Sequence, residues 1–460
     1  NPKLQIRNPR GAGFLLLGGL GVSPNFFTPP RLREPEGVEN LDCHWKAPYA
    51  ILAVRDKKMS LDLNQVAAQI EGMAANLKAE QKGKEGRLSH ALEVFHAKSS
   101  DLDSLRKRVE NSKTTWLVAG IASELIGHHK SISCPPDFAV IAVDGSHIDV
   151  DRHSAARCCL INIGSVVLRY GQKPEAMLRS QPALYASEQD LTIVDPLGRG
   201  EQPLERDLLG IKRAVAECQA LAELCEELPP DLPTLALLDG SLIMWGLAGQ
   251  AYPDYVKKEL LENGFLQALN RIKELSPKKK LALASYISFP RRTEVVNALR
   301  VAICPYDPPD CDRNCPRSAP SSKRECEAVA GVQDSSIFSR ILEPGERSAT
   351  FISRSSVVQK HYGENEVRFF YLKGDEEIAR VEFPRWVEER GLIDLVQTLV
   401  LDQCRRGQGY PVALSEAHEQ AVVTGADREQ FQYLVELALS EKRLSTTTSA
   451  KSRSKKTRWI

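Results

Sequence analysis

The sequence has no excess of charge of either sign and no long apolar run. Its 460 residues include 61 Lys and Arg against 60 Asp and Glu. This balance excludes a protein that is basic over its whole surface, but it is compatible with a local basic groove that binds nucleic acid. No apolar run reaches the roughly 18 residues of a membrane span. The 11 cysteines lack the regular pairing of a secreted disulfide framework. We therefore expect reduced thiols, a cytoplasmic location and no membrane partner.

Aromatic residues are also few, at 6%, yet 42% of the chain is hydrophobic, which is enough for a buried core. Met59 opens a stretch that reads like a natural start, so residues 1–58 are expected to be a disordered extension or upstream sequence foreign to the native protein. The remaining chain is expected to hold a helical arm at 59–135, a main domain at 136–440 with an irregular Cys- and Pro-rich insertion at 304–333, and a basic disordered tail at 441–460.

The arm is predicted from helical spacing. Its apolar residues recur every three or four positions, at Leu63, Val66, Ile70, Met73 and Leu77. We expect a helical hairpin over residues 60–130 that packs on the core or on a partner.

The main domain alternates strand and helix patterns. Strands are predicted at 135–148, entered after a proline pair, at 156–171 as one strand or a hairpin, at 233–247 and at 278–288, with helices at 204–228 and 252–275. Three more strands at 348–356, 366–374 and 377–387 precede helices at 392–407, 411–423 and 427–440. This order favours a mixed α/β sheet with helices on its faces.

An acidic tripeptide occurs twice, each time after a buried strand: Asp144-Gly145-Ser146 and Asp239-Gly240-Ser241. If the strands are neighbours in an open sheet, the two carboxylates lie a few ångströms apart and repel each other. A divalent cation with hard oxygen ligands, Mg²⁺ or Mn²⁺, would remove that conflict. The alternative is that both copies are simple turns, because Asp-Gly is a common turn signal.

Further candidate ligands lie on two predicted helices. Glu217 flanks the apolar face of helix 204–228, and Glu223 is the second choice because the helical period directs it elsewhere. His418 falls on the apolar stripe of helix 411–423, eight residues after Tyr410. A histidine in that position is as compatible with a core residue as with a metal ligand.

These residues together resemble the NurA nucleases, a family of DNA-end-processing enzymes. The resemblance covers residues 138–435 and is carried by "VDGSH", "KRAVAE", "LLDGSL", "SYISFPRRTEVVNALR", "EIARVEFPRWV" and "GYPVALSEAHEQAVV", in this order. The chain departs from the family at His147, where an arginine is frequent.

The resemblance implies a ribonuclease H-like core, Mn²⁺-dependent DNA cleavage at a two-metal site, and a homodimer working beside a hexameric HerA-type translocase in double-strand-break repair. Members act as 5′-to-3′ exonucleases and cut single-stranded DNA internally. Carried over by position, Asp144, Glu217 and Asp239 are the metal-binding carboxylates, and Tyr410 and His418 are further catalytic residues, His418 also as a metal ligand.

Basic side chains are needed to hold the DNA backbone. The doublet Arg291 and Arg292, directly after a predicted strand end, is the first choice. Lys278 to Lys280, Arg300, and Arg405 with Arg406 are weaker candidates.

The insertion holds four cysteines, Cys304, Cys311, Cys315 and Cys326. Their spacing is not the tight pairing of common zinc sites, but an irregular loop of this kind has little else to fold around. The alternatives are a structural Zn²⁺ or iron–sulfur cluster and four free thiols.

Two rival functions stay open at this point. One is another ribonuclease H-like phosphotransferase, of the transposase or guide-dependent type. The other is a non-catalytic scaffold that clamps DNA and docks a translocase through the helical arm. Asp144 and Asp239 lying far apart in space would favour the scaffold.

Overall fold

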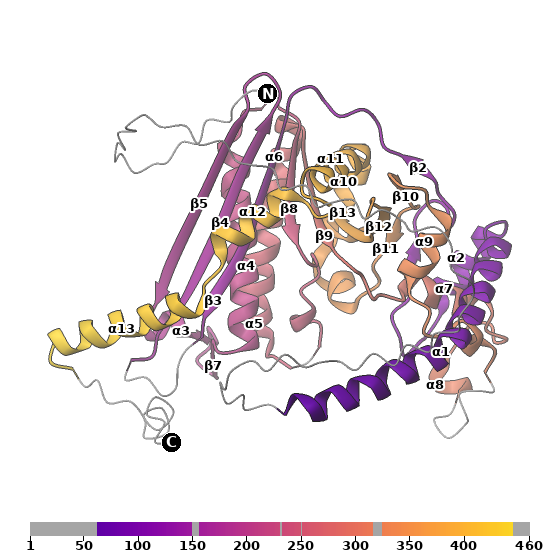
Figure 1. Ribbon diagram of the computed structural model, residues 1–460, viewed down its shortest axis with the longest axis horizontal. Coiled ribbons are helices and arrows are strands. Elements are labelled where there is room, and N and C mark those ends of the chain that lie inside the picture. The colour runs from indigo at the N-terminus through magenta and orange to yellow at the C-terminus, as the bar shows by residue number, and fades with distance from the viewer. Residues whose placement is uncertain (1–61, 150–155, 231, 250, 316–323, 445–460) are drawn as a thin grey trace, which may run out of the picture. The chain divides into compact units, whose positions relative to one another are not determined.

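The computed structural model describes residues 62–149, 156–230, 232–249, 251–315 and 324–444. The predicted N-terminal extension and residues 445–460 of the predicted basic tail lie outside this part of the chain. Figure 1 shows the described elements, which form a mixed α/β fold with a large central sheet.

The central sheet has eleven strands, with the main order β1-β11-β12-β13-β9-β8-β3-β4-β5 and with β2 and β10 attached beside β12. The strands are β1 (Gly120–Ile121), β2 (His129–Lys130), β3 (Phe138–Ile148), β4 (Cys159–Tyr170), β5 (Glu175–Tyr185), β8 (Thr234–Asp239), β9 (Leu281–Ile287), β10 (Glu346–Arg347), β11 (Phe351–Ile352), β12 (Val367–Lys373) and β13 (Ile378–Pro384). A small separate sheet pairs β6 (Thr192–Val194) with β7 (Glu201–Pro203).

Five of these strands have a ribonuclease H-like arrangement, which confirms the predicted fold class. β3, β4 and β5 form an antiparallel meander, and β3 pairs in parallel with β8, which in turn pairs in parallel with β9. The spatial order β5-β4-β3-β8-β9 therefore places the first strand of the meander in the middle.

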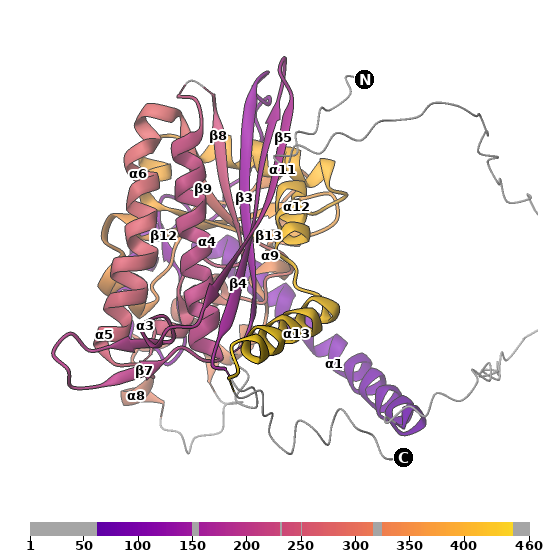
Figure 2. The same ribbon diagram turned by 90° about the vertical axis from the view of Figure 1, so that its left-hand side faces the viewer.

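Helices cover both faces of this part of the sheet. α4 (Asp207–Glu227) and α6 (Gln267–Lys279) lie on one face, and α11 (Ile393–Arg406) and α12 (Val412–Ala421) lie on the other (Figure 2). Because both faces are covered, residues 138–143 of β3 are buried without alternation, which explains their continuous apolar run.

Residues of β12 contribute to both of the two larger apolar cores. The remaining helices, which lie around the sheet, are α1 (Leu63–Lys98), α2 (Leu102–Asn111), α3 (Glu188–Leu191), α5 (Asp254–Lys257), α7 (Glu294–Ala302), α8 (Cys311–Asn314), α9 (Asp334–Ile341), α10 (Arg385–Glu389) and α13 (Gly425–Glu441). Of these, α8 and α13 have no buried residue. Short segments of 3₁₀- or π-helix lie at η1 (Trp245–Leu247), η2 (Lys258–Leu266), η4 (Glu325–Val329), η5 (Val358–Tyr362) and η6 (Gly363–Asn365).

The predicted helical arm is wrong beyond Asn111. The next residues, Ser112 to Trp116, include a pair of β-branched threonines, and Gly120–Ile121 then pairs with β11 as strand β1. Residues 129 and 130 also join the main sheet. The alternative of a hairpin at 156–171 is wrong as well, since β4 runs unbroken through Gly164.

By its internal contacts the chain divides at residue 81. In residues 8–81 the described part is the N-terminal portion of α1, where Leu63, Ile70, Met73 and Leu77 are exposed. In the larger unit, the later part of α1 buries Ala91 and Phe95 in the core that α2 and α7 share. None of the helices in the described residues is long and apolar enough to cross a membrane.

A charge network is buried where β13 meets α7. Arg380 is fully buried, with Nη1 3.0 Å from Glu294 Oε1 and Nε 2.9 Å from Glu382 Oε1. Burial alone would lower the pKa of Arg380, but the two carboxylates hold it above its ordinary value. The other oxygen of Glu382 accepts hydrogen bonds from Ser241 Oγ and from the backbone N–H of Leu242. The network therefore fixes the loop that follows Asp239.

Candidate active site

The two repeated aspartates lie on adjacent strands. β3 and β8 pair in parallel up to Val143 and Leu238, so Asp144 and Asp239 come next at the same edge. Neighbouring strands are separated by about 4.8 Å, which brings the two carboxylates together. This placement removes the condition under which the scaffold would have been favoured.

The first tripeptide is not a turn, contrary to the simplest interpretation of its sequence. β3 continues to Ile148, paired with β4, so Asp144 leaves from within a strand. Only the second tripeptide turns, because β8 ends at Asp239 and Gly240 has a φ of +80°.

Two glycines let helices approach this point closely. A Cβ on Gly145 would lie 2.6 Å from Glu217 Oε1 on α4. A Cβ on Gly164, which pairs with Asp144 across β3 and β4, would lie 2.3 Å from the carbonyl oxygen of Ala417 on α12. A larger residue at Gly145 would displace the side chain of Glu217, whereas a larger residue at Gly164 would meet the backbone of α12 and displace the helix that carries His418.

Polar side chains of β3 and β4 hold the end of α12. Ser146 Oγ donates to the carbonyl oxygen of Ala421 at 2.5 Å, and Asn162 Nδ2 donates to the same oxygen at 2.9 Å. These bonds satisfy a carbonyl that the end of a helix would otherwise leave without a partner. They also fix the helix that presents His418.

His418 and Tyr410 each contact one aspartate. His418 Nδ1 lies 2.8 Å from Asp144 Oδ2, and the hydroxyl of Tyr410 is hydrogen-bonded to Asp239. The prediction that His418 lies on the apolar stripe is wrong: its side chain is 63% exposed, and Ala417 takes the buried position. An imidazole that touches a carboxylate and also faces solvent is placed to bind or transfer a proton.

Glu217 is the helix carboxylate that faces the site, whereas Glu223 is exposed. The Glu217 side chain is 14% exposed, and its Oε1 lies 3.0 Å from Arg213 Nε without the alignment of a hydrogen bond. Burial raises the pKa of Glu217 to about 8, opposed by Arg213 and reinforced by the charges of Asp144 and Asp239. Burial is also the main reason that the pKa of Asp239 is raised.

The donor set fits a divalent cation. The site combines three clustered carboxylates and an imidazole, and the buried Oε1 of Glu217 has no hydrogen-bond partner. Carboxylates that raise one another's pKa are stabilised by added positive charge. As they stand, no three His, Cys, Asp or Glu side chains among the described residues form a ready coordination group, so binding requires side-chain adjustment.

Sequence reasoning missed Arg213. It lies one helical turn before Glu217 in "KRAVAE", and the i,i+4 spacing of an arginine and a glutamate was the available signal. Its side chain keeps positive charge beside the carboxylates.

The predicted DNA-binding residues differ in position. Arg291 and Arg292 follow β9 at the same edge as Asp239, and the Arg292 guanidinium lies 4.3 Å from the ring centroid of Trp245. Lys278 to Lys280 precede β9 and therefore lie at its opposite end. Arg300 contacts Glu327 and Trp116, and Arg406 pairs with Asp402, so neither is free.

The four cysteines of the insertion come together. Cys304, Cys311, Cys315 and Cys326 line one small cavity of about 20 Å³ beside Trp116. All are free thiols. Burial raises the pKa of Cys311 and Cys326, and Cys304 adds to both shifts. The four thiols share one cavity, but among the described residues no three of them are placed to hold a metal ion as they stand.

These features define an α/β protein with a ribonuclease H-like sheet and an acidic cluster where its parallel strands meet. The NurA domain model matches residues 138–423, more than half of the chain. The chain therefore belongs to the NurA family, which is a family of nucleases.

Two solved structures are similar to parts of the chain. The Argonaute of Aquifex aeolicus matches with 11% identity and a TM-score of 0.23, over 64% of this chain and 29% of its own length. The RuvC of Thermus thermophilus matches with 12% identity and a TM-score of 0.14, over 44% of this chain and 96% of its own. Scores this low add nothing to the strand order, on which the fold assignment rests. No curated protein matches the chain.

Proposed function

We propose that the protein is a metal-dependent deoxyribonuclease. The observation that carries this proposal is the placement of Asp144 and Asp239 on adjacent parallel strands, with the buried Glu217 against them. Three carboxylates in one place raise the free energy of the empty site, and a divalent cation lowers it.

Each site residue has a role that its contacts support. Asp144, Glu217 and Asp239 hold the cations, Mn²⁺ or Mg²⁺, and His418 joins them as a ligand or carries a proton to and from solvent. Divalent cations held by these residues would supply an activated water and would neutralise charge on the phosphate and on the leaving oxygen. Asp144 orients His418, and Tyr410 is held by Asp239 where it can orient the scissile phosphate.

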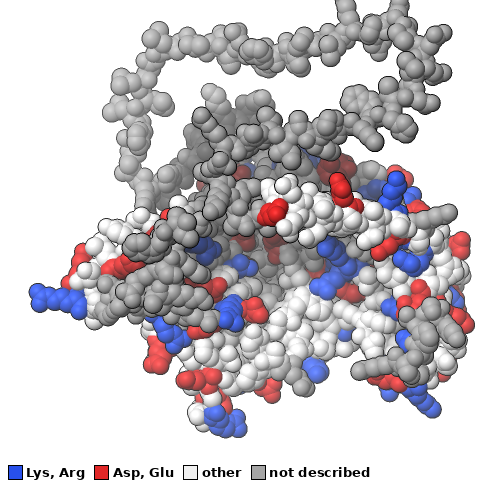
Figure 3. Space-filling model, turned by 60° about the horizontal axis from the view of Figure 1, so that its bottom comes forward, with Lys and Arg blue, Asp and Glu red and all other residues white. Residues whose placement is uncertain are grey.

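The DNA backbone would be held by a small number of lysine and arginine side chains rather than by a broad basic surface. On the side shown in Figure 3, basic and acidic side chains are interspersed. Arg291 and Arg292 follow β9 at the edge of the sheet where Asp239 lies.

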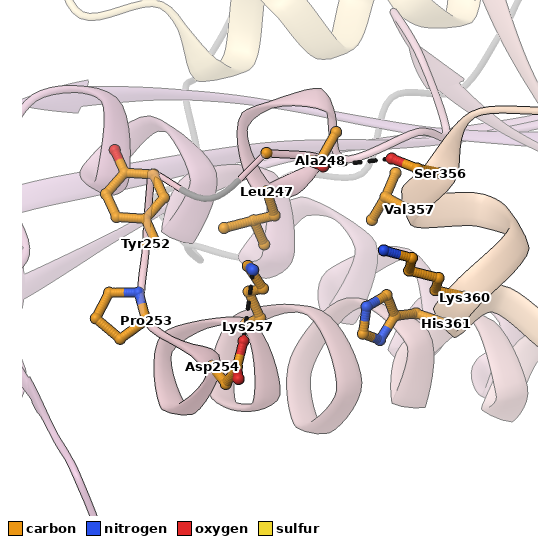
Figure 4. Close-up of a pocket in the computed structure, with 11 residues that line it drawn as sticks. Leu247, Ala248, Tyr252, Pro253, Asp254, Lys257, Ser356, Val357, Lys360 and His361 are labelled. Atoms are coloured by element: carbon orange, nitrogen blue, oxygen red, sulfur yellow. Dashed lines mark hydrogen bonds and ion pairs between the residues drawn. The ribbon is translucent and has the colours of Figure 1, made fainter.

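A further cavity of about 660 Å³ lies beyond the loop that follows Asp239, and its lining includes Lys360 and the ion pair of Lys257 with Asp254. Lys257 and Lys360 reach into this cavity from two sides (Figure 4). We include it as a backbone-binding surface for a longer strand.

The finer activities are part of the same proposal. We propose 5′-to-3′ exonuclease and single-stranded endonuclease activity in DNA end processing for double-strand-break repair and homologous recombination, as a homodimer beside a HerA-type translocase. The alternative is a scaffold that clamps DNA and docks the translocase without cutting. The acidic cluster disfavours the scaffold, because a clamp gains nothing from carboxylates close to a phosphate backbone.

The test is a cleavage assay on end-labelled single- and double-stranded DNA with EDTA, Mg²⁺ or Mn²⁺. We expect cleavage that needs the cation and falls at least 100-fold in Asp144→Ala and in Asp239→Ala. Glu223→Ala is the matched control, since that carboxylate is exposed on the same helix as Glu217. Binding without cleavage under every cation would leave the scaffold, and cleavage that survives both substitutions would place the chemistry elsewhere.

The cysteine cavity is proposed as a separate structural metal site. We favour Zn²⁺ because four cysteines around one small cavity match its preference for four thiolate ligands in a closed structural site. Metal analysis of purified protein should give about one Zn²⁺ per chain that Cys311→Ser loses and that Asp144→Ala and Cys134→Ser keep. Iron with sulfide would replace the single-ion assignment, and four freely titrating thiols would remove the site.

A further inference from the structure

One aromatic side chain beside the site is exposed to an unusual degree. Phe289 is 77% exposed, the highest value among the large apolar side chains that are exposed in the described residues. Burying an aromatic ring is favourable, so the exposure of Phe289 is a cost that the apolar core does not explain.

The backbone of Phe289 is also strained. Its φ is +44°, a left-handed conformation that side chains with a Cβ rarely adopt. The strain is maintained by Glu377, which accepts hydrogen bonds from the Phe289 backbone N–H at 3.1 Å and from Ser288 Oγ at 2.8 Å. A strained residue that its surroundings hold in place indicates a function that needs this orientation.

A chain of contacts links Phe289 to the acidic cluster. Tyr286 pairs with Asp239 across β9 and β8, and its ring packs edge-on against Tyr410, with 5.6 Å between ring centroids. The hydroxyl of Tyr286 donates to Glu377 at 2.7 Å, the same carboxylate that holds the Phe289 backbone. Phe289 therefore lies two residues beyond Ile287, where the strand that flanks the site ends.

Two arginines, Arg291 and Arg292, follow Phe289 closely in the chain. The carboxylate that holds the Phe289 backbone, Glu377, is also bound by Ser288 and Tyr286. Arg291 is exposed and makes no hydrogen bond or ion pair to any of the residues that the structure describes. The guanidinium of Arg292 lies over the ring of Trp245. A single ring is too small for a protein interface, which needs a contiguous apolar patch. The ring of Phe289 has the right size to stack on one nucleobase. The arginines would then contact phosphates of the same DNA strand.

We propose that Phe289 stacks on an unpaired base of the DNA strand that enters the site, with Arg291 holding the adjacent phosphate. The inference rests on the proposed nuclease function and names the form of DNA that the site prefers: a single strand, or a duplex end with an unpaired overhang. A base within a blunt duplex is already stacked on its neighbours and would gain nothing from the ring.

The test is binding in EDTA, which separates binding from cleavage. Fluorescence anisotropy with a labelled oligonucleotide should show single-stranded DNA bound roughly 5- to 100-fold more weakly by Phe289→Ala than by wild type, with blunt duplex unchanged. Phe289→Trp should keep the affinity, and Phe289→Leu should lose it, because leucine is apolar but lacks a π-face. Leu197→Ala, which removes another 70% exposed apolar side chain, is the matched control and should bind normally.

A second variant separates function from structure. Phe289→Gly should raise the melting temperature, because glycine adopts a positive φ without strain, while it lowers the affinity for single strands as Phe289→Ala does. A packing role would give the opposite change in melting temperature. Single-strand affinity that survives Phe289→Ala would overturn the inference. Affinity that falls in this variant while wild type cuts nothing with any cation would retain the stacking site and overturn the nuclease.

Discussion

The two Asp-Gly-Ser tripeptides have the same sequence and opposite construction. In the first, the chain stays in strand β3, and a Cβ on Gly145 would meet Glu217 at 2.6 Å. In the second, β8 ends, Gly240 turns with a φ of +80°, and a Cβ there would meet nothing within 4 Å. The first glycine is needed for space and the second for conformation.

The serines differ in the same way. Ser146 binds the carbonyl oxygen at the end of α12, which carries His418. Ser241 binds Glu382 and so joins the Asp239 loop to the buried Arg380. One copy is therefore fixed to a helix at the surface and the other to a charge network in the core. A repeated motif marks equivalent chemistry at its aspartates, but the structure around each copy has to be determined separately.

The largest expected effect comes from breaking the core support of the second tripeptide. Arg380→Met leaves Glu294 and Glu382 buried without their cation and should lower the free energy of unfolding by roughly 3 to 5 kcal/mol. Urea denaturation measures this change. Arg169→Met is the control, because its pair with Glu175 is partly exposed and should be worth less than about 1 kcal/mol.

A triple variant sharpens this first test. If the loss comes from uncompensated charge, adding Glu294→Gln and Glu382→Gln to Arg380→Met should recover much of the stability. A triple variant as unstable as the single one would attribute the loss to the packing of Arg380 on Phe369, whose ring centroid lies 3.5 Å from the guanidinium.

The two glycines test the comparison directly. Gly145→Ala should lower the cleavage rate by about 100-fold, because the methyl group displaces Glu217. Gly240→Ala should instead cost about 1 to 2 kcal/mol of unfolding free energy from its left-handed backbone. Cleavage assays and thermal melts on both variants separate the two effects. Equal losses of activity and stability in the two variants would remove the distinction.

Glu217 links the first tripeptide to pH. In EDTA its folded pKa is about 8 and its ordinary value is 4.5, so the native state binds more protons between these limits and the free energy of unfolding falls as pH rises through them. Glu217→Gln should remove this fall and stabilise the metal-free protein above pH 8 by roughly 1 to 4 kcal/mol. Melts at several pH values measure it. Parallel curves for wild type and variant would exclude Glu217 as the titrating group.

The sequence predicted most of the sheet because buried strands and amphipathic helices leave strong patterns. It missed β5, where Pro182 and exposed polar residues obscure the signal, because an edge strand tolerates both. In "IARVEFP" the alternation of apolar and charged residues indicates a strand with one solvent-exposed face, yet Arg380 and Glu382 are buried. Alternation reports polarity, whereas burial depends on which helices cover the strand.

The residues of the site were predictable in kind but not in orientation. The pattern offered both Glu217 and Glu223, and only the packing of α4 on β3 places Glu217 against the aspartates. Phe289 was not predicted, because its exposure and its positive φ leave no trace in residue type. The only pattern that indicated Arg213 was its i,i+4 spacing from Glu217. Arg213 could therefore be identified as a site residue only after Glu217 had been chosen.

The serines should give the smallest effects and the finest distinction. Ser146→Ala removes one of two side-chain donors to Ala421, so it should cost about 1 kcal/mol or less while lowering cleavage several-fold through a looser His418. Ser241→Ala removes a bond to a fully buried carboxylate and should cost about 1 to 2 kcal/mol. Melting curves should therefore rank Ser241→Ala as the less stable variant, and cleavage rates at saturating cation should rank Ser146→Ala as the slower enzyme relative to its stability. The reverse ranking would mean that the surface helix, and not the core network, is the stronger support.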